Sequence, residues 1–147
     1  KFETTPLSMV VIVPDFPFPT KSSRAALPVD VSRQDAIFNL SRLVFLVEAL
    51  QEGDLDLLSL GMQDKLHQPY RIPLIPGATE AVQAAKEAGA AAVVLSGAGA
   101  SLLAVLKTKE QENNVISAME DAFQAAGLQV RHFTPGVSRS GAFIINL

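Results

Sequence analysis

Two short apolar runs, residues 91–95 and 102–106, flank the glycine-rich sequence Ser96-Gly97-Ala98-Gly99-Ala100-Ser101. Glycine lacks a Cβ and adopts positive φ readily, so this sequence predicts a tight turn between two antiparallel strands. Such a turn also exposes backbone amides to which an anion can bind. It is no dinucleotide fingerprint, because a third glycine is missing and a strand follows, and the sequence contains no Walker loop. The turn is therefore either a plain hairpin or one wall of a site for a phosphorylated or carboxylated small molecule.

The remaining pattern places this hairpin in an α+β domain. Strands are predicted over residues 9–13, 91–95, 102–106, 128–133 and 142–145. The first is a continuous β-branched run that ends at Pro14, which predicts a central strand buried on both faces. One helix is predicted over residues 79–88 with Gly89 at its end, and another begins at a capping box formed by Thr108 and Gln111. The order of elements predicts a ferredoxin-like antiparallel sheet with helices packed on one face.

A predicted helical insertion follows the first strand. Thr20 offers a hydroxyl N-cap to a short helix over residues 21–27. Ser32, with Asp35 three residues later, resembles the capping box of a longer helix that ends at Gly53. Apolar residues recur along that helix in one stripe, the pattern of a helix that packs on a core: Ala36, Leu40, Leu43, Val44 and Val47.

Between this helix and the glycine turn the pattern is more interrupted. Shorter helical pieces are predicted over residues 54–60 and 63–66. Asp54 and Asp56 come at the start of the first piece, where carboxylates favour a helix N-terminus. Residues 69–77 contain three prolines, which remove amide donors and fix φ, so no regular helix is predicted there.

The composition limits the kinds of partner that the chain can bind. With 147 residues, of which 48% are hydrophobic and 18% charged, it is predicted to form one compact domain. The formal net charge is −3 and the Lys and Arg residues are scattered, so no nucleic-acid-binding face is predicted. The absence of cysteine excludes disulfides and thiolate metal sites and fits a cytoplasmic location. Residues 88–106 carry no charge, but the glycine turn interrupts them and no membrane span is predicted.

Two arginines in proline-marked segments are the candidate ligand-binding residues. Neither Arg24 nor Arg71 has an acidic neighbour at helical spacing. A guanidinium holds a carboxylate through two parallel hydrogen bonds, so two such groups from distant segments predict a site for an amino-acid carboxylate. The alternative is a pair of solvated surface arginines.

The two histidines have separate interpretations. His67 is either a general base or a structural residue that caps a turn, and His132 is predicted to lie in a strand. Because the histidines are isolated and the chain has no thiolates, no metal site is predicted.

Taken together, the motifs resemble the homoserine kinase family of the GHMP small-molecule kinase superfamily. The resemblance spans nearly the whole chain, and the combination of its first and third stretches is specific. The glycine turn alone would indicate only the superfamily. The matching stretches are VPDFPFPTKSSRAALP (residues 13–28), DAIFNLSRLVFLVEAL (35–50), DKLHQPYRIPLIPG (64–77) and VVLSGAGASLLAV (93–105).

The resemblance assigns roles to particular residues. It implies that Thr20, Arg24 and Arg71 form the substrate site, with the two arginines on the carboxylate of L-homoserine. It implies that the glycine turn lines the phosphate side of the site, through Ser96, Gly97, Ala98 and Gly99. Many relatives have Pro where this chain has Ala100, a change that raises the entropy of the unfolded chain and leaves the amides of the turn available. No catalytic residue is assigned to this chain.

The family's N-terminal half holds a phosphate loop of the GLGSSAA type and a magnesium-binding carboxylate, and neither motif occurs here. The chain also begins at Lys1 rather than at Met. The resemblance therefore implies that residues 1–147 are a single C-terminal domain whose ATP-binding N-terminal half is absent. ATP and Mg²⁺ are then expected in the intact enzyme and not on this chain alone, and a homodimer is also an expectation. The alternatives are a free-standing amino-acid-binding regulatory domain and a GHMP kinase for another small alcohol, such as mevalonate or a sugar.

Overall fold

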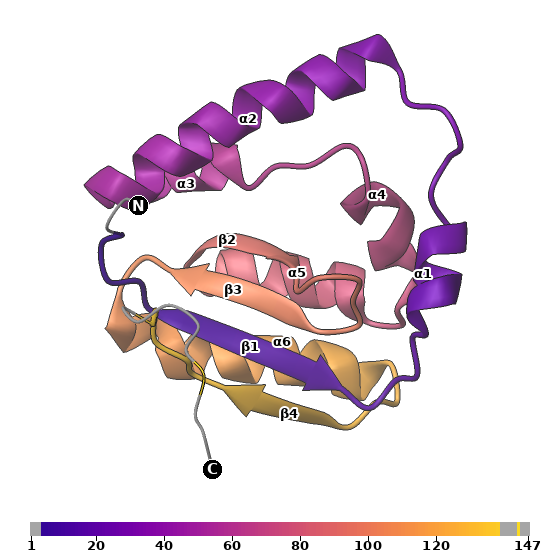
Figure 1. The fold of residues 1–147 in the computed structure, drawn as a ribbon. Helices are drawn as coiled ribbons and strands as arrows, with labels where there is room; N and C mark the ends of the chain where they lie inside the picture. The colour runs from indigo at the N-terminus through magenta and orange to yellow at the C-terminus, as the bar shows by residue number, and fades with distance from the viewer. Residues whose placement is uncertain (1–3, 139–143, 145–147) are drawn as a thin grey trace.

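A computed structural model describes residues 4–138 and 144 (Figure 1). Its centre is a four-stranded sheet in the order β2-β3-β1-β4, in which every neighbouring pair is antiparallel. The strands are β1 (Met9–Pro14), β2 (Ala90–Leu95), β3 (Leu102–Leu106) and β4 (Val130–Phe133). This order confirms the ferredoxin-like α+β fold. Apart from residue 144, the strand predicted over residues 142–145 lies outside the described residues.

One face of the sheet carries the main hydrophobic core. The helices α5 (Ala78–Glu87) and α6 (Glu112–Ala125) cover it, as Figure 1 shows behind the strands. The capping box of Thr108 and Gln111 starts the second of these helices through a short 3₁₀ turn, η2 (Lys109–Gln111). The core joins side chains from both helices to alternate residues of β1 and β3; its members include Val10, Ile12, Ala81, Ala85, Leu102, Ala104, Val115, Met119 and Phe123.

Part of the opposite face is covered by the helical insertion. The long helix α2 (Arg33–Glu52) begins at the N-cap Ser32, ends at the left-handed Gly53 and is followed by α3 (Leu55–Gly61). A second buried cluster joins the C-terminal end of α2 to α3 and the sheet through Ala49, Leu58 and Val105. The helices are therefore not confined to one face, because the insertion adds a partial second layer.

This partial layer leaves strand β1 buried on one face only. Val10, Ile12 and Pro14 are buried, whereas Met9, Val11 and Val13 are partly exposed. The prediction that the strand is buried on both faces was therefore wrong. Side chains alternate along a strand, and in the described part of the chain no helix covers Val11 on the second face as fully as α5 and α6 cover the first.

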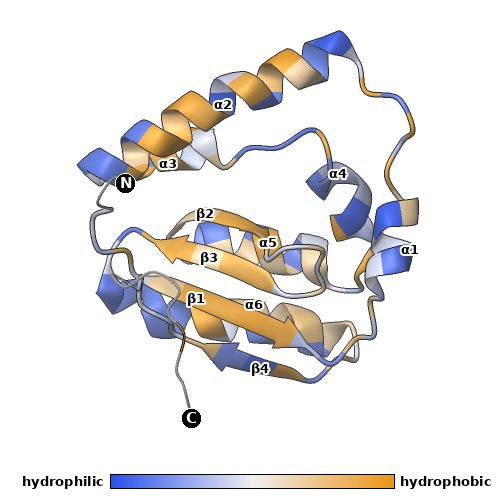
Figure 2. Cartoon of the chain, viewed as in Figure 1, coloured by the Kyte–Doolittle hydropathy of each residue, from blue (hydrophilic) through white to orange (hydrophobic). Residues whose placement is uncertain are grey.

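The apolar stripe of α2 does not pack into a core. Leu40 and Val44 are each 68% exposed, Leu43 is 58% exposed and Val47 is 38% exposed. Figure 2 shows the hydrophobic residues along this helix, which stands away from the sheet over much of its length. The pattern identified the helix correctly, but these residues do not contribute to the buried core of the described chain. No helix that the structure describes is both long and apolar enough to cross a membrane.

Two proline-rich segments differ from their predictions. The first short helix is α1 (Thr20–Ala25), and the Thr20 hydroxyl does not cap it, because the helix already starts at Thr20 after Pro19. A short helix, α4 (Gln68–Arg71), and a 3₁₀ turn, η1 (Ile72–Leu74), lie in the segment where no helix was predicted. Proline is tolerated there because it sits in the first turn of each piece, where its missing amide has no helical partner. Residues 63–66 form no helix.

Burial predicts a large effect on stability for one apolar truncation and a small effect for another. Phe123 is fully buried between α6 and the sheet, so we expect Phe123→Ala to lower the free energy of unfolding by about 3–5 kcal/mol. Val44→Ala on the exposed stripe should change it by less than about 0.5 kcal/mol. Urea unfolding of both variants checks this. A loss at Val44 as large as that at Phe123 would show that the stripe is buried in this chain.

Candidate functional site

Three segments far apart in the sequence meet at one end of the sheet. They are α1, α4 and the glycine turn between β2 and β3 (Figure 1). Ser23 of α1 is completely buried, and its hydroxyl donates a hydrogen bond of 2.7 Å to the carbonyl of Ala98 in the turn. The carbonyl of the same serine accepts a hydrogen bond of 3.1 Å from Nε of Arg71. One buried residue therefore connects the two segments on which sequence analysis placed the substrate and phosphate sides of a site.

A second hydrogen bond ties α4 to the sheet. The side-chain oxygen of Gln68 accepts from the amide of Leu95, the last residue of β2, at 2.9 Å. Gln68 and Arg71 lie three residues apart, so they anchor one helical turn at both of its ends. The helix that carries Arg71 is thus fixed to the strand that leads into the glycine turn.

Asp64 fixes the chain that enters α4. Its carboxylate accepts hydrogen bonds from the backbone amides of Leu66, His67 and Gln68 and from the side-chain amide of Asn39 on α2. Burial alone would raise the pKa of Asp64, but these hydrogen bonds favour the carboxylate and together lower its pKa below the usual value. Asp64 is therefore charged at neutral pH and acts as a cap rather than as a proton donor or acceptor.

The glycine turn has the geometry of a tight hairpin with an open outer side. The amide of Ser96 donates to the carbonyl of Ser101 at 2.8 Å, and Gly97 and Gly99 adopt φ values of 64° and 93°. A Cβ on Gly99 would also lie 3.2 Å from side-chain atoms of Ile75, Leu95 and Phe18, so both conformation and packing require glycine there. A Cβ on Gly97 would meet nothing within 4 Å.

The outer side of the turn presents free donors. Within the described part of the chain, the amides of Gly97 and Ala98 have no acceptor. Consecutive amides of this kind can bind an anion, as predicted for the phosphate side of the site.

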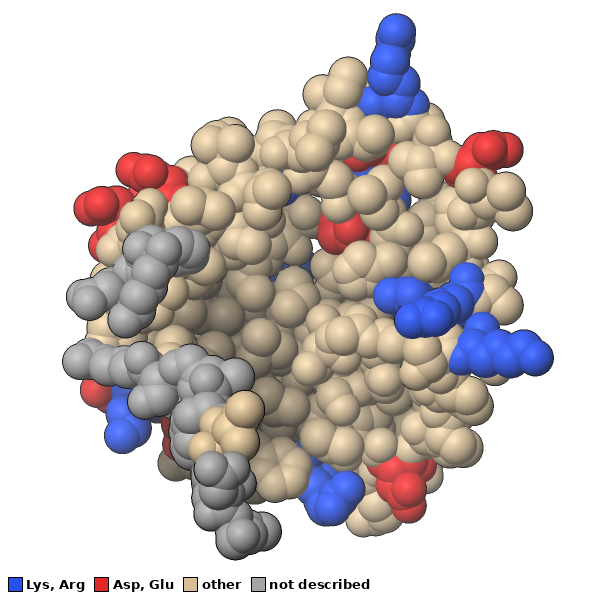
Figure 3. All heavy atoms as spheres, in the orientation of Figure 1, with Lys and Arg blue, Asp and Glu red and all other residues tan. Residues whose placement is uncertain are grey.

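The residues that were predicted to bind the substrate lie on the helices that adjoin this turn. Thr20 and Arg24 are four residues apart on α1, so they share the exposed face of that helix, and Ser23 between them points inward. Figure 3 shows Lys and Arg atoms at the surface where Figure 1 places this helix. Arg71 is hydrogen-bonded to Ser23, the residue that precedes Arg24. Neither the Thr20 hydroxyl nor the Arg24 guanidinium bonds to any described residue, and the terminal nitrogens of Arg71 are also unbonded there.

Together these groups can bind an anion and neutralise its charge. Two guanidinium groups and a pair of free amides suit a ligand with a carboxylate at one end and phosphate chemistry at the other. The described residues contain no group of three or more His, Asp or Glu side chains able to hold a metal ion.

Neither histidine takes part in this arrangement. His132 lies in β4, as predicted, with Nδ1 at 2.8 Å from a Glu120 oxygen on α6. His67 precedes α4, and its Nε2 lies 3.9 Å from Asp64.

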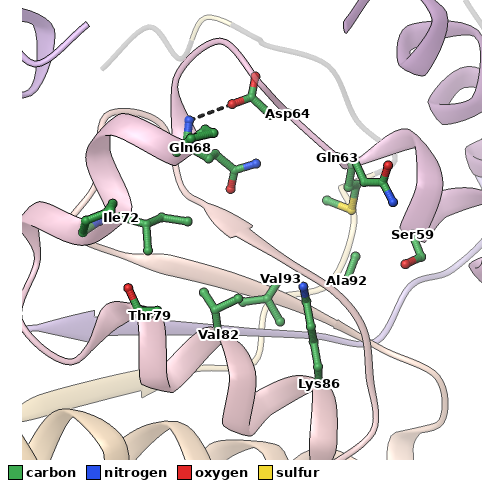
Figure 4. A pocket seen from close by; sticks show the side chains of 13 residues that line it. Ser59, Gln63, Asp64, Gln68, Ile72, Thr79, Val82, Lys86, Ala92 and Val93 are labelled. Carbon is green, nitrogen blue, oxygen red and sulfur yellow. Dashed lines mark hydrogen bonds between the residues drawn. The ribbon is translucent and has the colours of Figure 1, made fainter. Parts of the chain in front are cut away.

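A nearby cavity does not belong to this junction. It has a volume of about 430 Å³ and lies between α3, α4, α5 and the edge strand β2, with Ser59, Gln63, Thr79 and Lys86 among its lining residues. Figure 4 shows the side chains of Gln68 and Ile72 on its α4 side. None of Thr20, Arg24, Arg71 or the glycine turn lines it. The cavity and the candidate site therefore lie at different places along α4.

Sequence analysis missed the residues that position the site. Ser23 stood inside a matching stretch, but nothing in the pattern distinguished it from the adjacent Ser22. Asp64 carried a usable signal, because an aspartate before a proline-marked turn often accepts the following amides. Gln68 and Asn39 gave no such signal, since their partners are distant in sequence.

Comparisons with known proteins show the family to which the chain belongs. Residues 46–125 match the family described as "GHMP kinases C terminal". Homoserine kinase of Moorella thermoacetica is 45% identical over 141 residues, which are 95% of this chain, and that of Desulfitobacterium hafniense is 43% identical over 136 residues. The crystal structure of homoserine kinase from Cytophaga hutchinsonii superposes with a TM-score of 0.86 at 29% identity, covering 91% of this chain and 43% of that one. Mevalonate kinase of L. major shares the fold with a TM-score of 0.62 at 20% identity.

The chain spans about half the length of the curated relatives that it matches. It covers 46% of both the M. thermoacetica and the D. hafniense proteins. The similarity therefore concerns one part of a longer polypeptide in these relatives.

Removing the Ser23 hydroxyl should loosen the junction. Ser23→Ala leaves the partly buried carbonyl of Ala98 without its donor, so we expect a loss of about 1 kcal/mol in unfolding free energy. Ser22→Ala, on the exposed side of the same helix, is the matched control and should change it by less than about 0.3 kcal/mol. Equal effects of the two variants in urea unfolding would contradict the bridging role.

Asp64→Asn should make stability less dependent on acid pH. Because the pKa of Asp64 is lower in the folded than in the unfolded chain, its contribution is complete above about pH 4 and is lost as pH falls through the folded value. We expect the variant to be less stable by about 1.5–3 kcal/mol at neutral pH, with a difference that shrinks at lower pH. Thermal unfolding between neutral and acid pH checks this, with the exposed Asp121→Asn as control. A difference that grows on acidification would contradict the assignment.

Proposed function

The chain belongs to the GHMP kinases C-terminal family, and from this premise we propose that it is the substrate-side part of an ATP-dependent kinase that phosphorylates the side-chain hydroxyl of L-homoserine. The observation that carries the proposal is the junction at Ser23. There Arg24, whose guanidinium is unbonded, and Arg71, whose terminal nitrogens are unbonded, adjoin the serine that is hydrogen-bonded to a glycine turn with free amides. The names of the relatives supply the substrate, because homoserine kinases match over more than nine-tenths of this chain.

In the proposed reaction this chain positions the substrate and neutralises its charge. Arg24 and Arg71 hold the carboxylate of L-homoserine, and Thr20 supports the pocket from the same face of α1. The hydroxyl of the substrate then lies toward the glycine turn, whose amides face the transferred phosphoryl group. Phosphoryl transfer depends mainly on positioning and electrostatic stabilisation, so a part of the enzyme that contributes no proton-transfer residue can still contribute to the rate.

ATP and Mg²⁺ are assigned to the part of the enzyme that this chain does not span. The sequence has no phosphate loop, and the described residues hold no carboxylate cluster that fits a metal ion. We therefore infer that residues 1–147 form one C-terminal domain whose partner is an ATP-binding N-terminal half. From the similarity to homoserine kinases we also propose that the reaction belongs to threonine biosynthesis, that the enzyme is cytoplasmic and that it forms a homodimer.

ADP release tests the proposal directly. The protein to use is a fused polypeptide in which the part of the M. thermoacetica homoserine kinase outside the match precedes this chain. We expect ATP-dependent ADP release with L-homoserine from the fused polypeptide and none from the chain alone. Activity with mevalonate or a sugar but not with L-homoserine would overturn the substrate assignment. If the fused polypeptide has no kinase activity while the chain alone binds L-homoserine saturably, a regulatory domain is the better account.

Arg71→Ala should weaken binding of the substrate carboxylate in particular. Loss of a charge-assisted hydrogen bond costs about 1.5–3 kcal/mol, so KM for L-homoserine should rise about tenfold to a hundredfold. For 3-aminopropan-1-ol, which lacks the carboxylate, Arg71→Ala should raise KM much less. In a double-mutant cycle, removing the arginine and removing the carboxylate eliminate the same interaction, so their effects are not additive. The exposed Arg33→Ala at the start of α2 is the control. An unchanged KM for L-homoserine would remove Arg71 from the site.

A further inference from the structure

The exposed stripe of α2 faces no partner within the described chain. Ile37, Leu40, Leu43, Val44 and Val47 recur every three or four residues and are 38–68% exposed. Single exposed apolar side chains are ordinary, but a continuous stripe over several helical turns marks an interaction surface. The helix has 20 residues and is therefore about 30 Å long, and only its C-terminal end joins a buried cluster.

A second apolar row lies on the sheet face that α5 and α6 leave open. In the strand register, Val94 lies opposite Leu103, Leu103 opposite Val11, and Val11 opposite Phe133. These four residues cross the whole sheet on one face, and none of them is buried. Phe133, at the far edge, is 53% exposed.

The region between the stripe and the row is hollow, and Arg42 and Asp64 are the charged residues that line its groove. Figure 3 shows this face in the orientation of Figure 1, with tan atoms over its recessed centre and charged side chains mostly at its rim. A groove of about 290 Å³ runs between α2 and β2, and its lining includes Leu43 from the stripe and Val94 from the row. The two apolar features therefore border one recess.

The same groove contains two buried nitrogen atoms without a partner. Nε of Arg42 and Nδ1 of His67 are buried and form no hydrogen bond within the described residues. A buried polar atom without a partner costs free energy, so a body that fills the groove would be expected to bring an acceptor to Arg42 Nε and a hydrogen-bond partner to His67 Nδ1. The neighbouring Asp64 cannot do this fully, because its oxygens already accept four other hydrogen bonds.

We propose that this face, from the α2 stripe to the Val94–Phe133 row, is where the remaining part of the relatives' polypeptide docks. The relatives are about twice as long as this chain, so they carry a further body of comparable size. The groove is also lined by Leu95 and Gln68, which adjoin the glycine turn and α4. A body on this face is thus continuous with the candidate site. This inference rests on the proposed function for the identity of the occupant, but not on the choice of substrate.

A second copy of this chain fits the face less well. In a two-fold dimer the same surface would meet itself, so the unpaired Nε of Arg42 in each copy would face a groove with the same unpaired donor. Complementary surfaces pair donors with acceptors, so a body that differs from this chain is better able to supply an acceptor for Arg42 Nε. The expected occupant therefore presents apolar side chains together with carboxylate or carbonyl oxygens.

Cysteine labelling tests the docking face, because the chain itself has no cysteine. Leu40→Cys places a thiol on the stripe, and Val29→Cys, at a position that is 99% exposed and lies before α2, is the matched control. The rate of maleimide labelling at each position is followed by peptide mass spectrometry in the chain alone and in the fused polypeptide. No ATP or substrate is added, so failure of the kinase assay does not affect the result.

We expect labelling at Leu40→Cys to be at least about tenfold slower in the fused polypeptide, with no change at Val29→Cys. Equal rates at Leu40→Cys in both proteins would overturn the proposal. The proposal would also be overturned if labelling at Leu40→Cys in the chain alone became slower as the concentration of the chain rose. That result would assign the face to a second copy of the chain. A second experiment co-expresses this chain with the remaining part of the relative and measures how much of that part is recovered with the chain. The double variant Leu40→Asp with Val44→Asp should reduce this recovery at least about tenfold. The control Val29→Asp should leave it unchanged. Undiminished recovery with the double variant would equally contradict docking on this face.

Discussion

The candidate site depends on one buried serine. Ser23 has no exposed surface, and it joins the glycine turn through its hydroxyl and Arg71 through its carbonyl. Because a buried hydrogen-bonding group is costly to leave unpaired, α1, α4 and the turn hold one another in place. Gln68 and Asp64 extend the same network to β2 and α2. The arginines and the free amides are therefore presented by a fixed frame rather than by three independent loops.

The frame lies at the border of a face that the chain does not cover. One side of the sheet has a complete core, whereas the other carries the end of α2, α3 and an exposed apolar row. A domain that functions as a separate monomer would be expected to bury this apolar row and the apolar stripe of α2. The uncovered face and the candidate site adjoin at Leu95 and Gln68. In the proposed enzyme, docking of the remaining part of the polypeptide on this face would therefore also complete the site.

Local signals in the sequence predicted local structure well. Ser32, Gly53 and the pair Thr108 and Gln111 ended or started helices where expected, because caps involve neighbouring residues. The glycine turn and the strand order were also predicted. The exposure of the α2 stripe was not predicted. Periodicity shows that a helix has an apolar face, but it does not show which part of the protein packs on that face. The helix at Pro69 was missed because proline in a first turn is compatible with helix.

The residues that support the candidate site could not be predicted from the sequence, and the ligand-binding residues named from it stay predictions. Arg24, Arg71 and the glycines were found through resemblance to a family, and the structure places them at one junction, while their roles remain proposals. Ser23, Gln68 and Asn39 act through partners 25 to 75 residues away, a distance that no sequence pattern encodes.

A crystal structure of the fused polypeptide with L-homoserine bound tests the central claim most directly. The account predicts the substrate carboxylate within hydrogen-bond distance of the Arg24 and Arg71 guanidinium groups, and the substrate hydroxyl toward the Ser96–Ser101 turn. L-homoserine bound elsewhere, for example in the cavity beside Lys86, would contradict it.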